Sequence, residues 1–309
     1  MTSSGPKVSI CIVTYNQEKY VEKCIDSVLA QIVNFEYEII IADDCSTDET
    51  KNILSRYSSA HSDKIKFVSH EQNIGPFRNF VFAHTEARGD YVVHLDGDDY
   101  TLPGKLQAQA DYLDENPDCA IVWHRMNSID QSSGFMYEDN YVENGIVYKK
   151  IDIVDLISNI TIGFNSSKMY RRDYEHRDWL DYYELDFPFN VLKVINKKKY
   201  AAFVSDAVYG VYRSNIGISF THNYEIKIKI YKWLLRYYKD KLIDKSQINA
   251  KIALLLLSDL KHRQRTVFYG VYAFLSTCMS FKIQSLRLIH SKRINILTKF
   301  KKVDKDLYL

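Results

Sequence analysis

Short apolar runs alternate with amphipathic stretches through the first third of the chain. Continuous apolar residues predict buried strands at Val8–Val13, Tyr37–Ala42, Ile65–Ser69 and Tyr91–Leu95. The stretches between them are about 10 to 15 residues long and repeat apolar positions at helical spacing. Strands that alternate with helices predict an α/β fold in which a mostly parallel central sheet is flanked by helices.

Polar residues at the starts of the amphipathic stretches agree with this assignment. Asn16 precedes the predicted helix Glu18–Gln31, and Ser46 precedes the next helix with Glu49 three residues further on. Pro103 suits the first turn of another helix, predicted over residues 102–116. We therefore expect Asn16 and Ser46 to cap helices.

The pattern changes after residue 119. Further strands are predicted at Cys119–His124, Ile162–Tyr170 and Val208–Arg213, and further helices near Ile151–Ser158 and Phe187–Asn196. From Tyr224 onward, long helical patterns dominate. These changes predict an α/β domain at residues 1–222, followed by a helical C-terminal extension at residues 223–309.

Composition limits the class of protein. A chain of 309 residues with 46% apolar content can bury a sizeable core. The five cysteines are scattered and form no C-x-x-C pair, so they indicate neither a disulfide framework nor a zinc site, and a reducing cytoplasm fits best. The longest weakly polar run, Val267–Phe281, falls short of the roughly 20 residues that span a bilayer. We expect a cytoplasmic protein, either soluble or peripheral on the inner face of the membrane.

The net charge of +2 hides an asymmetry. Residues 1–222 hold 22 Lys and Arg against 33 Asp and Glu, whereas residues 223–309 hold 19 against 6. In the basic part, KIKIYKWLLRYYKDK and SLRLIHSKRINILTKFKK mix cations with aromatic and aliphatic residues, as in helices that lie on anionic membranes. The alternatives are an appendage that packs on the first domain, or an oligomer interface. No nucleic-acid motif accompanies the charge, so nucleic acid is not expected as a partner.

Three carboxylates crowd the end of the fourth predicted strand. In YVVHLDGDDY, Asp96, Asp98 and Asp99 directly follow an apolar run, where an unpaired charge is costly. Mg²⁺ or Mn²⁺ takes oxygen ligands, commonly one or two carboxylates together with substrate phosphates. Gly97 lets a ligand or backbone approach closely. A cation site is the functional interpretation of this D-x-D spacing, and an acidic turn before the next helix is the alternative.

A second acidic pair ends the second predicted strand. Asp43 and Asp44 stand in IIIADDCSTDET, directly before a predicted helix. Ligands of open parallel sheets bind beyond the carboxyl ends of the strands, so Asp44 is a candidate for contact with a base or ribose. Its alternative role is that of a turn or cap residue beside Ser46.

Four motifs in order carry a resemblance to a known family. PKVSICIVTYNQEKYVEKCIDSVLAQ, EIIIADDCSTDET, NIGPFRNF and GDYVVHLDGDDY resemble the nucleotide-sugar-binding half of glycosyltransferase family 2, which has the glycosyltransferase A fold. The resemblance covers residues 6–125 closely and residues 160–220 loosely. It implies a nucleotide-sugar half at about residues 6–125, an acceptor half at about 126–222, and metal-dependent transfer of a sugar with inversion.

The resemblance assigns roles to individual residues. Asp98 would bind Mn²⁺ or Mg²⁺, and Asp99 would assist directly or through water. Val13 stands where the family commonly has proline, although backbone contacts could survive that change. The implied donor-binding residues are Val13, Thr14, Tyr15, Asp44, Asn73, Arg78, Asn79 and Asp96.

The family's general base is an acidic residue ahead of a helix, after the D-x-D. In YYELDFPFNVLKVIN, Asp186 fits best, Glu184 is the near alternative and Asp181 a distant one. Asp186 has a second interpretation as a carboxylate favoured by the helix dipole.

One position departs from the family. VYRSNIGIS has Asn215 where a histidine is common, so Arg213 or His222 would compensate near the diphosphate. A surface ion pair is the alternative role for Arg213.

The resemblance predicts transfer from a nucleoside diphosphate sugar, with a UDP-sugar as first choice, to a glycan or lipid-linked acceptor in bacterial surface polysaccharide synthesis. A sugar-1-phosphate nucleotidyltransferase is an alternative enzyme, but it would need a glycine-rich basic loop that ICIVTYNQEKY lacks. A catalytically silent carbohydrate-binding or membrane-scaffold protein is an alternative from another class. The sugar and the acceptor depend on the irregular region 125–185.

Overall fold

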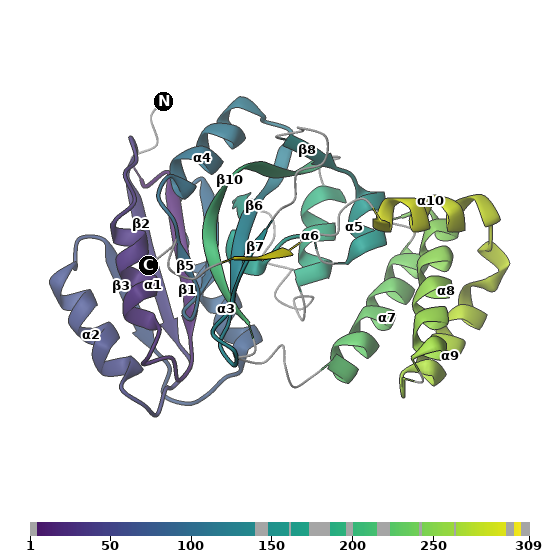
Figure 1. Ribbon diagram of the computed structural model, residues 1–309, viewed down its shortest axis with the longest axis horizontal. Coiled ribbons are helices and arrows are strands. Elements are labelled where there is room, and N and C mark those ends of the chain that lie inside the picture. The colour runs from purple at the N-terminus through teal and green to yellow at the C-terminus, as the bar shows by residue number, and fades with distance from the viewer. Residues whose placement is uncertain are drawn as a thin grey trace.

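Eleven strands form one sheet in the part of the chain that the computed structural model describes (Figure 1). That part comprises residues 5–139, 148–160, 162–172, 186–195, 200–214, 223–240, 243–262, 264–294 and 300–303. The strands are β1 (Val8–Thr14), β2 (Tyr37–Asp43), β3 (Ile65–Ser69), β4 (Tyr91–Asp96), β5 (Tyr100–Thr101), β6 (Cys119–Asp130), β7 (Met136–Asp139), β8 (Tyr148–Ile151), β9 (Met169–Arg171), β10 (Tyr200–Ser214) and β11 (Phe300–Val303). The helices are α1 (Val21–Leu29), α2 (Thr50–Ala60), α3 (Pro76–Thr85), α4 (Lys105–Glu115), α5 (Ile153–Asn159), α6 (Asp186–Ile195), α7 (Asn223–Asp240), α8 (Lys245–Lys261), α9 (Val267–Thr277) and α10 (Ile283–Ile294), with short 3₁₀ helices η1 (Asn165–Ser167) and η4 (Cys278–Ser280).

The first four predicted strands are confirmed as a parallel set. They lie in the order β3-β2-β1-β4, and each adjacent pair is parallel. Beyond β4, β9 runs antiparallel between β4 and β6, and β10 runs parallel to β6. Because β1, β2 and β4 are parallel, their carboxyl ends meet at one edge of the sheet, where ligands of such sheets bind.

Helices cover both faces of the sheet because alternate residues of each strand point to opposite sides. Ile10 and Ile12 of β1 join a buried cluster with residues of α1, α2 and α4. Cys11, between them, joins the opposite cluster with residues of α3, α5 and α6. The continuous apolar runs of the sequence therefore correspond to strands buried on both faces.

The predicted helix caps are wrong. α1 begins at Val21 and α2 at Thr50, and neither has a side-chain cap. Asn16 instead adopts a positive φ of 53°, and its Oδ1 accepts a hydrogen bond from the backbone N–H of Thr47 at 2.8 Å. Ser46 donates its backbone N–H to Asp43. Both polar residues join the loops at the strand ends, a tertiary use that competes with capping.

The predicted strand Ile162–Tyr170 is also wrong over most of its length. Only Met169–Arg171 forms a strand, and the residues before it turn through η1. In that turn the backbone N–H of Ser167 donates to the carbonyl of Phe164 at 3.0 Å, and the hydroxyl of Ser166 donates to Asp99 at 2.6 Å. The hydrogen bonds of Ser166 hold the turn against the end of β4, which an isolated strand pattern does not reveal.

The C-terminal helices pack on the rest of the molecule. α7 to α10 lie together at one end of the long axis, opposite α2 (Figure 1). Their core is continuous with that of α5 and α6, since Leu234, Tyr237 and Ile289 belong to the same buried cluster as Ile157. Two contacts outside the pattern predicted for this region also tie it down. β11 pairs antiparallel with β7, and buried Lys251 donates to the carbonyl of Ser158 at 2.6 Å. Among the described residues, no helix has the length and apolarity to cross a bilayer.

Candidate functional site

Carboxylates fasten the loops at the ends of β1 and β2. Buried Asp43 accepts the hydroxyl hydrogen bond of Thr14 at 3.0 Å. Its neighbour Asp44 accepts the backbone N–H groups of Ile74 at 2.7 Å and Gly75 at 3.0 Å. Gly75 has a φ of 88°, which favours glycine and lets the loop present its N–H to the carboxylate. Asp44 therefore shapes the loop before α3 as well as the edge of the sheet.

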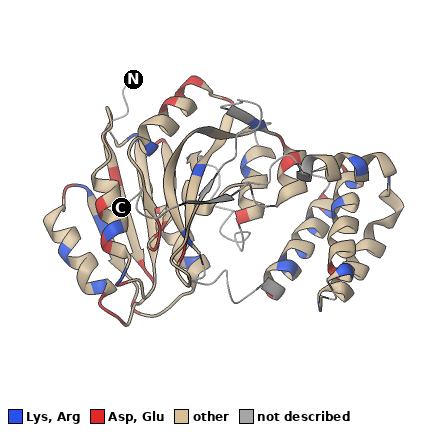
Figure 2. Ribbon diagram, in the orientation of Figure 1, with Lys and Arg blue, Asp and Glu red and all other residues tan. Residues whose placement is uncertain are grey.

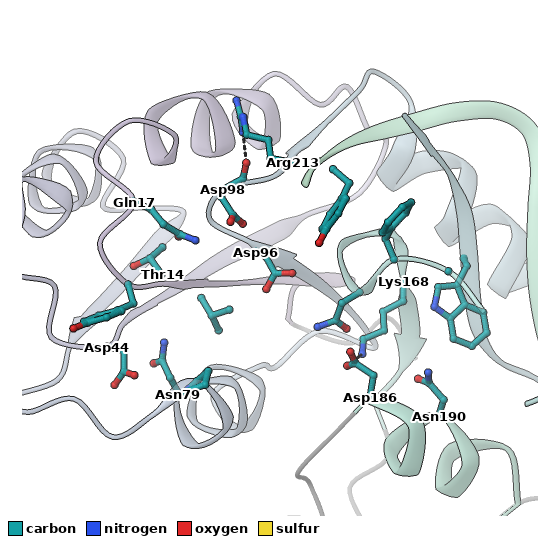
Figure 3. A pocket seen from close by; sticks show the side chains of 18 of the residues that line it. Thr14, Gln17, Asp44, Asn79, Asp96, Asp98, Lys168, Asp186, Asn190 and Arg213 are labelled. Atoms are coloured by element: carbon teal, nitrogen blue, oxygen red, sulfur yellow. Dashed lines mark hydrogen bonds and ion pairs between the residues drawn. The ribbon is translucent and has the colours of Figure 1, made fainter. Parts of the chain in front are cut away.

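A cavity of about 690 Å³ opens at this edge, within the usual range for small-molecule sites, roughly 300–1,000 Å³ (Figure 3). The structure brings most of the predicted site residues to its wall: Val13, Thr14, Tyr15, Asp44, Asn73, Asn79, Asp96, Asp98, Asp186 and Arg213. Arg78 is exposed and does not line the cavity. Glu184, Asp181, Asn215 and His222 lie outside the described residues.

Sequence reasoning missed the other half of the lining. Gln17, Trp123, Phe164, Asn165, Lys168, Asn190 and Tyr212 are all on the wall. Most come from β6, η1, α6 and β10, whose packing around the cavity has no periodic signal. Lys168 was the exception, because it stands directly before an apolar strand. A lysine that is buried with such a strand usually has an anionic partner, so an acidic partner could have been sought in the sequence.

The three carboxylates after β4 differ in their environments. Burial opposes the charged form of Asp96, but His94 and the hydroxyl of Ser166 hold its pKa below the ordinary value. Burial, and then the charge of Asp96, raise the pKa of Asp98 to about 7. Asp98 thus lines the cavity as a carboxylate that lacks enough positive charge around it, which is the condition that a bound cation relieves.

Asp99 lies behind the cavity wall. It is fully buried, and its carboxylate accepts the Ser166 hydroxyl at 2.6 Å and the backbone N–H of Arg213 at 2.9 Å. Burial raises the pKa of Asp99 well above its ordinary value, and the charges of Asp98 and Asp96 add to this. Direct contact with a metal ion needs a side chain that reaches the cavity, and Asp99 does not line it. Its observed contacts hold the strand-end loop to η1 and β10.

Gly97 allows the D-x-D loop to pack closely. A Cβ at this position would lie 2.6 Å from Thr14 Cγ2 and 2.4 Å from Gln17 Oε1. These separations are far below van der Waals contact, so a larger residue would push Asp96 and Asp98 away from the end of β1.

Arg213 closes the cavity above Asp98 (Figure 3). Its guanidinium donates to the backbone carbonyl of Asp98 and lies 4.9 Å from the ring centre of Tyr20 and 5.0 Å from that of Tyr100. The planar cation is therefore held at the wall between two aromatic rings, beside the acidic pair.

A buried chain of side chains reaches Asp96 from the interior. Tyr170 Oη lies 2.6 Å from His84 Nδ1, His84 Nε2 lies 2.9 Å from His94 Nδ1, and His94 Nε2 lies 3.1 Å from Asp96 Oδ1. Burial, with His94 and nearby lysines, lowers the pKa of His84 well below its ordinary value, so this ring is neutral. Because an ionised carboxylate only accepts hydrogen bonds, His94 Nε2 donates to Asp96, and His84 and Tyr170 support His94 from the interior.

Substitution of His94 tests whether the hydrogen-bonded series Tyr170–His84–His94 positions Asp96 for binding of the nucleotide sugar. Gln places an N–H near the Nε2 position and Asn near the Nδ1 position, so we expect His94→Gln to bind donor nearly as wild type. We expect His94→Asn to bind about tenfold more weakly, or ~1.4 kcal/mol, because it loses the hydrogen bond to the carboxylate. Titration calorimetry with donor measures the affinities, and unfolding curves of both variants control for stability. Equal affinities would exclude the positioning role.

Asp186 stands on the opposite wall of the cavity. It is the first residue of α6, its side chain is 48% exposed, and its Oδ1 accepts Lys168 Nζ at 3.0 Å. The Lys168 ammonium is buried and lies 4.7 Å from the ring centre of Phe189 and 5.4 Å from that of Phe80. A cation held between two rings thus orients the carboxylate toward the open cavity (Figure 3).

The carboxylates on the cavity wall suit a hard divalent cation. Within the described ranges, no group of three or more His, Cys, Asp or Glu side chains is placed to hold a metal ion unaided. The cavity instead offers Asp98 with Asp96 nearby, which matches the one or two carboxylates that Mg²⁺ or Mn²⁺ uses when substrate phosphates complete its shell.

Comparison with known proteins shows the family. The chain belongs to glycosyl transferase family 2, whose family model matches residues 9–179. It is 34% identical over 131 residues to the putative glycosyltransferase EpsE of Bacillus subtilis, covering 42% of this chain and 46% of EpsE. It is 30% identical over 186 residues to chondroitin synthase of Escherichia coli, covering 55% of this chain and 26% of the synthase. The matches span between about a quarter and a half of the length of such curated relatives.

A solved structure has the same fold. TarS residues 1–349 of S. aureus superpose with a TM-score of 0.62 at 18% identity, covering 94% of this chain and 88% of that one. The fold prediction of a glycosyltransferase A type, and the predicted family, are therefore confirmed.

Proposed function

We propose that this protein transfers a sugar, with inversion, from a nucleoside diphosphate sugar to a hydroxyl of a glycan or lipid-linked acceptor during bacterial surface polysaccharide synthesis. One observation carries the proposal: a single cavity joins Asp44, Asp96 and Asp98 on one wall to Asp186 on the other. Such a cavity can hold a nucleotide beside the strand ends and an acceptor beside the carboxylate of α6.

The proposed donor is a UDP-sugar. The first support is a solved TarS structure described as a complex with UDP-GlcNAc, with a TM-score of 0.60. The second is a relative named poly(ribitol-phosphate) beta-N-acetylglucosaminyltransferase TarS, 32% identical over 111 residues. A mannosyltransferase of the same fold is described with GDP-Man and Mn²⁺, at a TM-score of 0.54. The nucleobase of the donor is therefore one of the variables of the nucleotide-sugar panel described below.

The residues of the cavity divide the chemistry between its walls. In the proposed mechanism Asp44 and Asp96 bind the nucleobase and ribose, Asp98 would hold Mn²⁺ or Mg²⁺, and Arg213 supplies a further positive charge for the diphosphate. When bound, the cation stabilises the negative charge that develops on the leaving diphosphate. Asp186 accepts the proton of the acceptor hydroxyl while that oxygen attacks the anomeric carbon from the face opposite the leaving group, which inverts the configuration.

A panel of nucleotide sugars tests the proposal through thermal stability. We expect one of them, with Mn²⁺ or Mg²⁺ present, to raise the melting temperature, because a ligand at 100 times its Kd adds about 2.7 kcal/mol to the free energy of unfolding. The same donor in excess chelator is the control. If no nucleotide sugar stabilises the fold, the catalytically silent alternative is favoured. Stabilisation by a nucleoside triphosphate with a sugar phosphate would favour the nucleotidyltransferase.

A further inference from the structure

The apolar side of α7 is not available to a partner. Trp233, Leu234 and Tyr237 are buried in the core shared with α5 and α6. Lys227 on the same helix is 2.7 Å from Asp259 of α8. The aromatic residues of KIKIYKWLLRYYKDK therefore serve packing within the molecule, whereas Lys232, Arg236 and Lys239 are exposed.

α9 differs, because several of its large apolar residues lie on the outside. Phe268 is 85% exposed, Tyr272 63%, Leu275 64% and Met279, just beyond the helix in η4, 94%. Their spacing of four, three and four residues places them along one face. A surface helix of a soluble protein usually turns polar residues outward. An exposed apolar face of this kind indicates a surface that binds a protein partner or a membrane.

The inner face of α9 shows that the orientation is enforced. Gly270, Ala273 and Thr277 are buried against α7 and α8. A Cβ on Gly270 would lie 2.8 Å from the hydroxyl oxygen of Tyr231, and Thr277 Oγ1 accepts the side-chain amide of Asn249 at 2.9 Å. Only small side chains fit between the helices, so rotation of α9 cannot bury its large residues.

Cations flank the exposed face and acids are missing from it. Lys261 and Arg265 precede α9, Lys282 and Arg287 follow it, and all four are exposed. The sequence has no Asp or Glu between Asp259 and Asp304. α9 itself carries no charge and is uncoloured along its length, whereas Lys and Arg colour its neighbours (Figure 2).

We propose that the α9 face, defined as Phe268, Tyr272, Leu275 and Met279, inserts into the surface of an anionic lipid bilayer. The apolar stripe would enter the headgroup and acyl boundary while the flanking cations contact anionic headgroups, as in helices that lie in the membrane plane. The 11 residues of α9 span about 16 Å, enough to lie in the interface and too short to cross the bilayer.

A second copy of the chain fits this face less well. A symmetric dimer through α9 would bring Lys261, Arg265, Lys282 and Arg287 close to the cations that flank α9 in the second copy, and like charges brought together oppose association. An anionic bilayer satisfies both the apolar stripe and its basic flanks. The membrane contact does not rest on the proposed transferase activity.

Vesicle flotation of the full chain tests the contact without any donor. We expect binding to vesicles of phosphatidylcholine mixed with phosphatidylglycerol, weakened by high salt, and little binding to phosphatidylcholine alone. Phe268→Ser with Leu275→Ser should weaken binding at least about tenfold, and Lys261→Gln with Arg265→Gln should reduce the salt dependence, since Lys282 and Arg287 remain. Ile32→Ser is the matched control, since Ile32 is 89% exposed beside α1, outside the α9 face.

Three results would overturn the proposal. Wild-type protein that floats with neither vesicle would exclude it, as would binding that the α9 variants and Ile32→Ser change equally. A soluble dimer that Phe268→Ser with Leu275→Ser disperses would assign the face to a second copy instead. Melting temperatures with and without nucleotide sugar report the transferase site separately, and the α9 variants should leave that stabilisation intact.

Discussion

Asp98→Asn should lower kcat/KM for sugar transfer by about 10²–10³-fold, because the variant loses the charged ligand through which a cation stabilises the leaving diphosphate. The side chain lies on the cavity wall in an environment that raises its pKa to about 7, so a positive partner is what the site lacks. Donor affinity in Mn²⁺ or Mg²⁺ should fall as well, because the variant would hold less tightly the cation that offsets the charge of the diphosphate.

Initial rates and donor titrations in the presence of either metal measure both effects. Asp111→Asn is a matched control, because it removes one carboxylate from the exposed side of α4. Full turnover by Asp98→Asn, or by wild-type enzyme in excess chelator, would show that Asp98 holds no catalytic cation.

Asp186→Asn should separate binding from chemistry. The variant keeps the shape of the side chain and leaves Asp44, Asp96 and Asp98 in place, but it removes the proposed proton acceptor. Loss of a general base costs about 10²–10⁴-fold in rate, and it should lower kcat without a matching rise in the KM of the donor. Steady-state kinetics with donor and acceptor varied in turn give both parameters.

Glu184→Gln is the companion variant, since the two carboxylates are two residues apart in the chain. If Glu184→Gln is inactive while Asp186→Asn transfers sugar at the wild-type rate, the base is Glu184. If both variants remain active, the base lies outside this segment.

The cavity wall that carries Asp44, Asp96 and Asp98 was largely predictable from local sequence. Parallel strands with loops at their carboxyl ends place Asp44, Asp96 and Asp98 at one edge, and all three stand within three residues of the end of an apolar run. Burying such charges without partners is costly, so their position in the sequence already implied a site. Arg78, taken from a motif as a lining residue, shows the limit of this reasoning, because its side chain faces solvent.

The opposite cavity wall, which carries Lys168 and Asp186, and the α9 face were decided by tertiary packing. Lys168 meets Asp186 across 18 residues of sequence, and His84, His94 and Tyr170 meet in the interior only because α3, β4 and β9 pack together. Likewise, the pattern of Val267–Thr277 shows an apolar helix but not which side faces inward. That choice follows from space, since the small residues Gly270, Ala273 and Thr277 lie against α7 and α8, and a Cβ on Gly270 would already lie 2.8 Å from the Tyr231 hydroxyl oxygen. Phe268, Tyr272 and Leu275 therefore face outward.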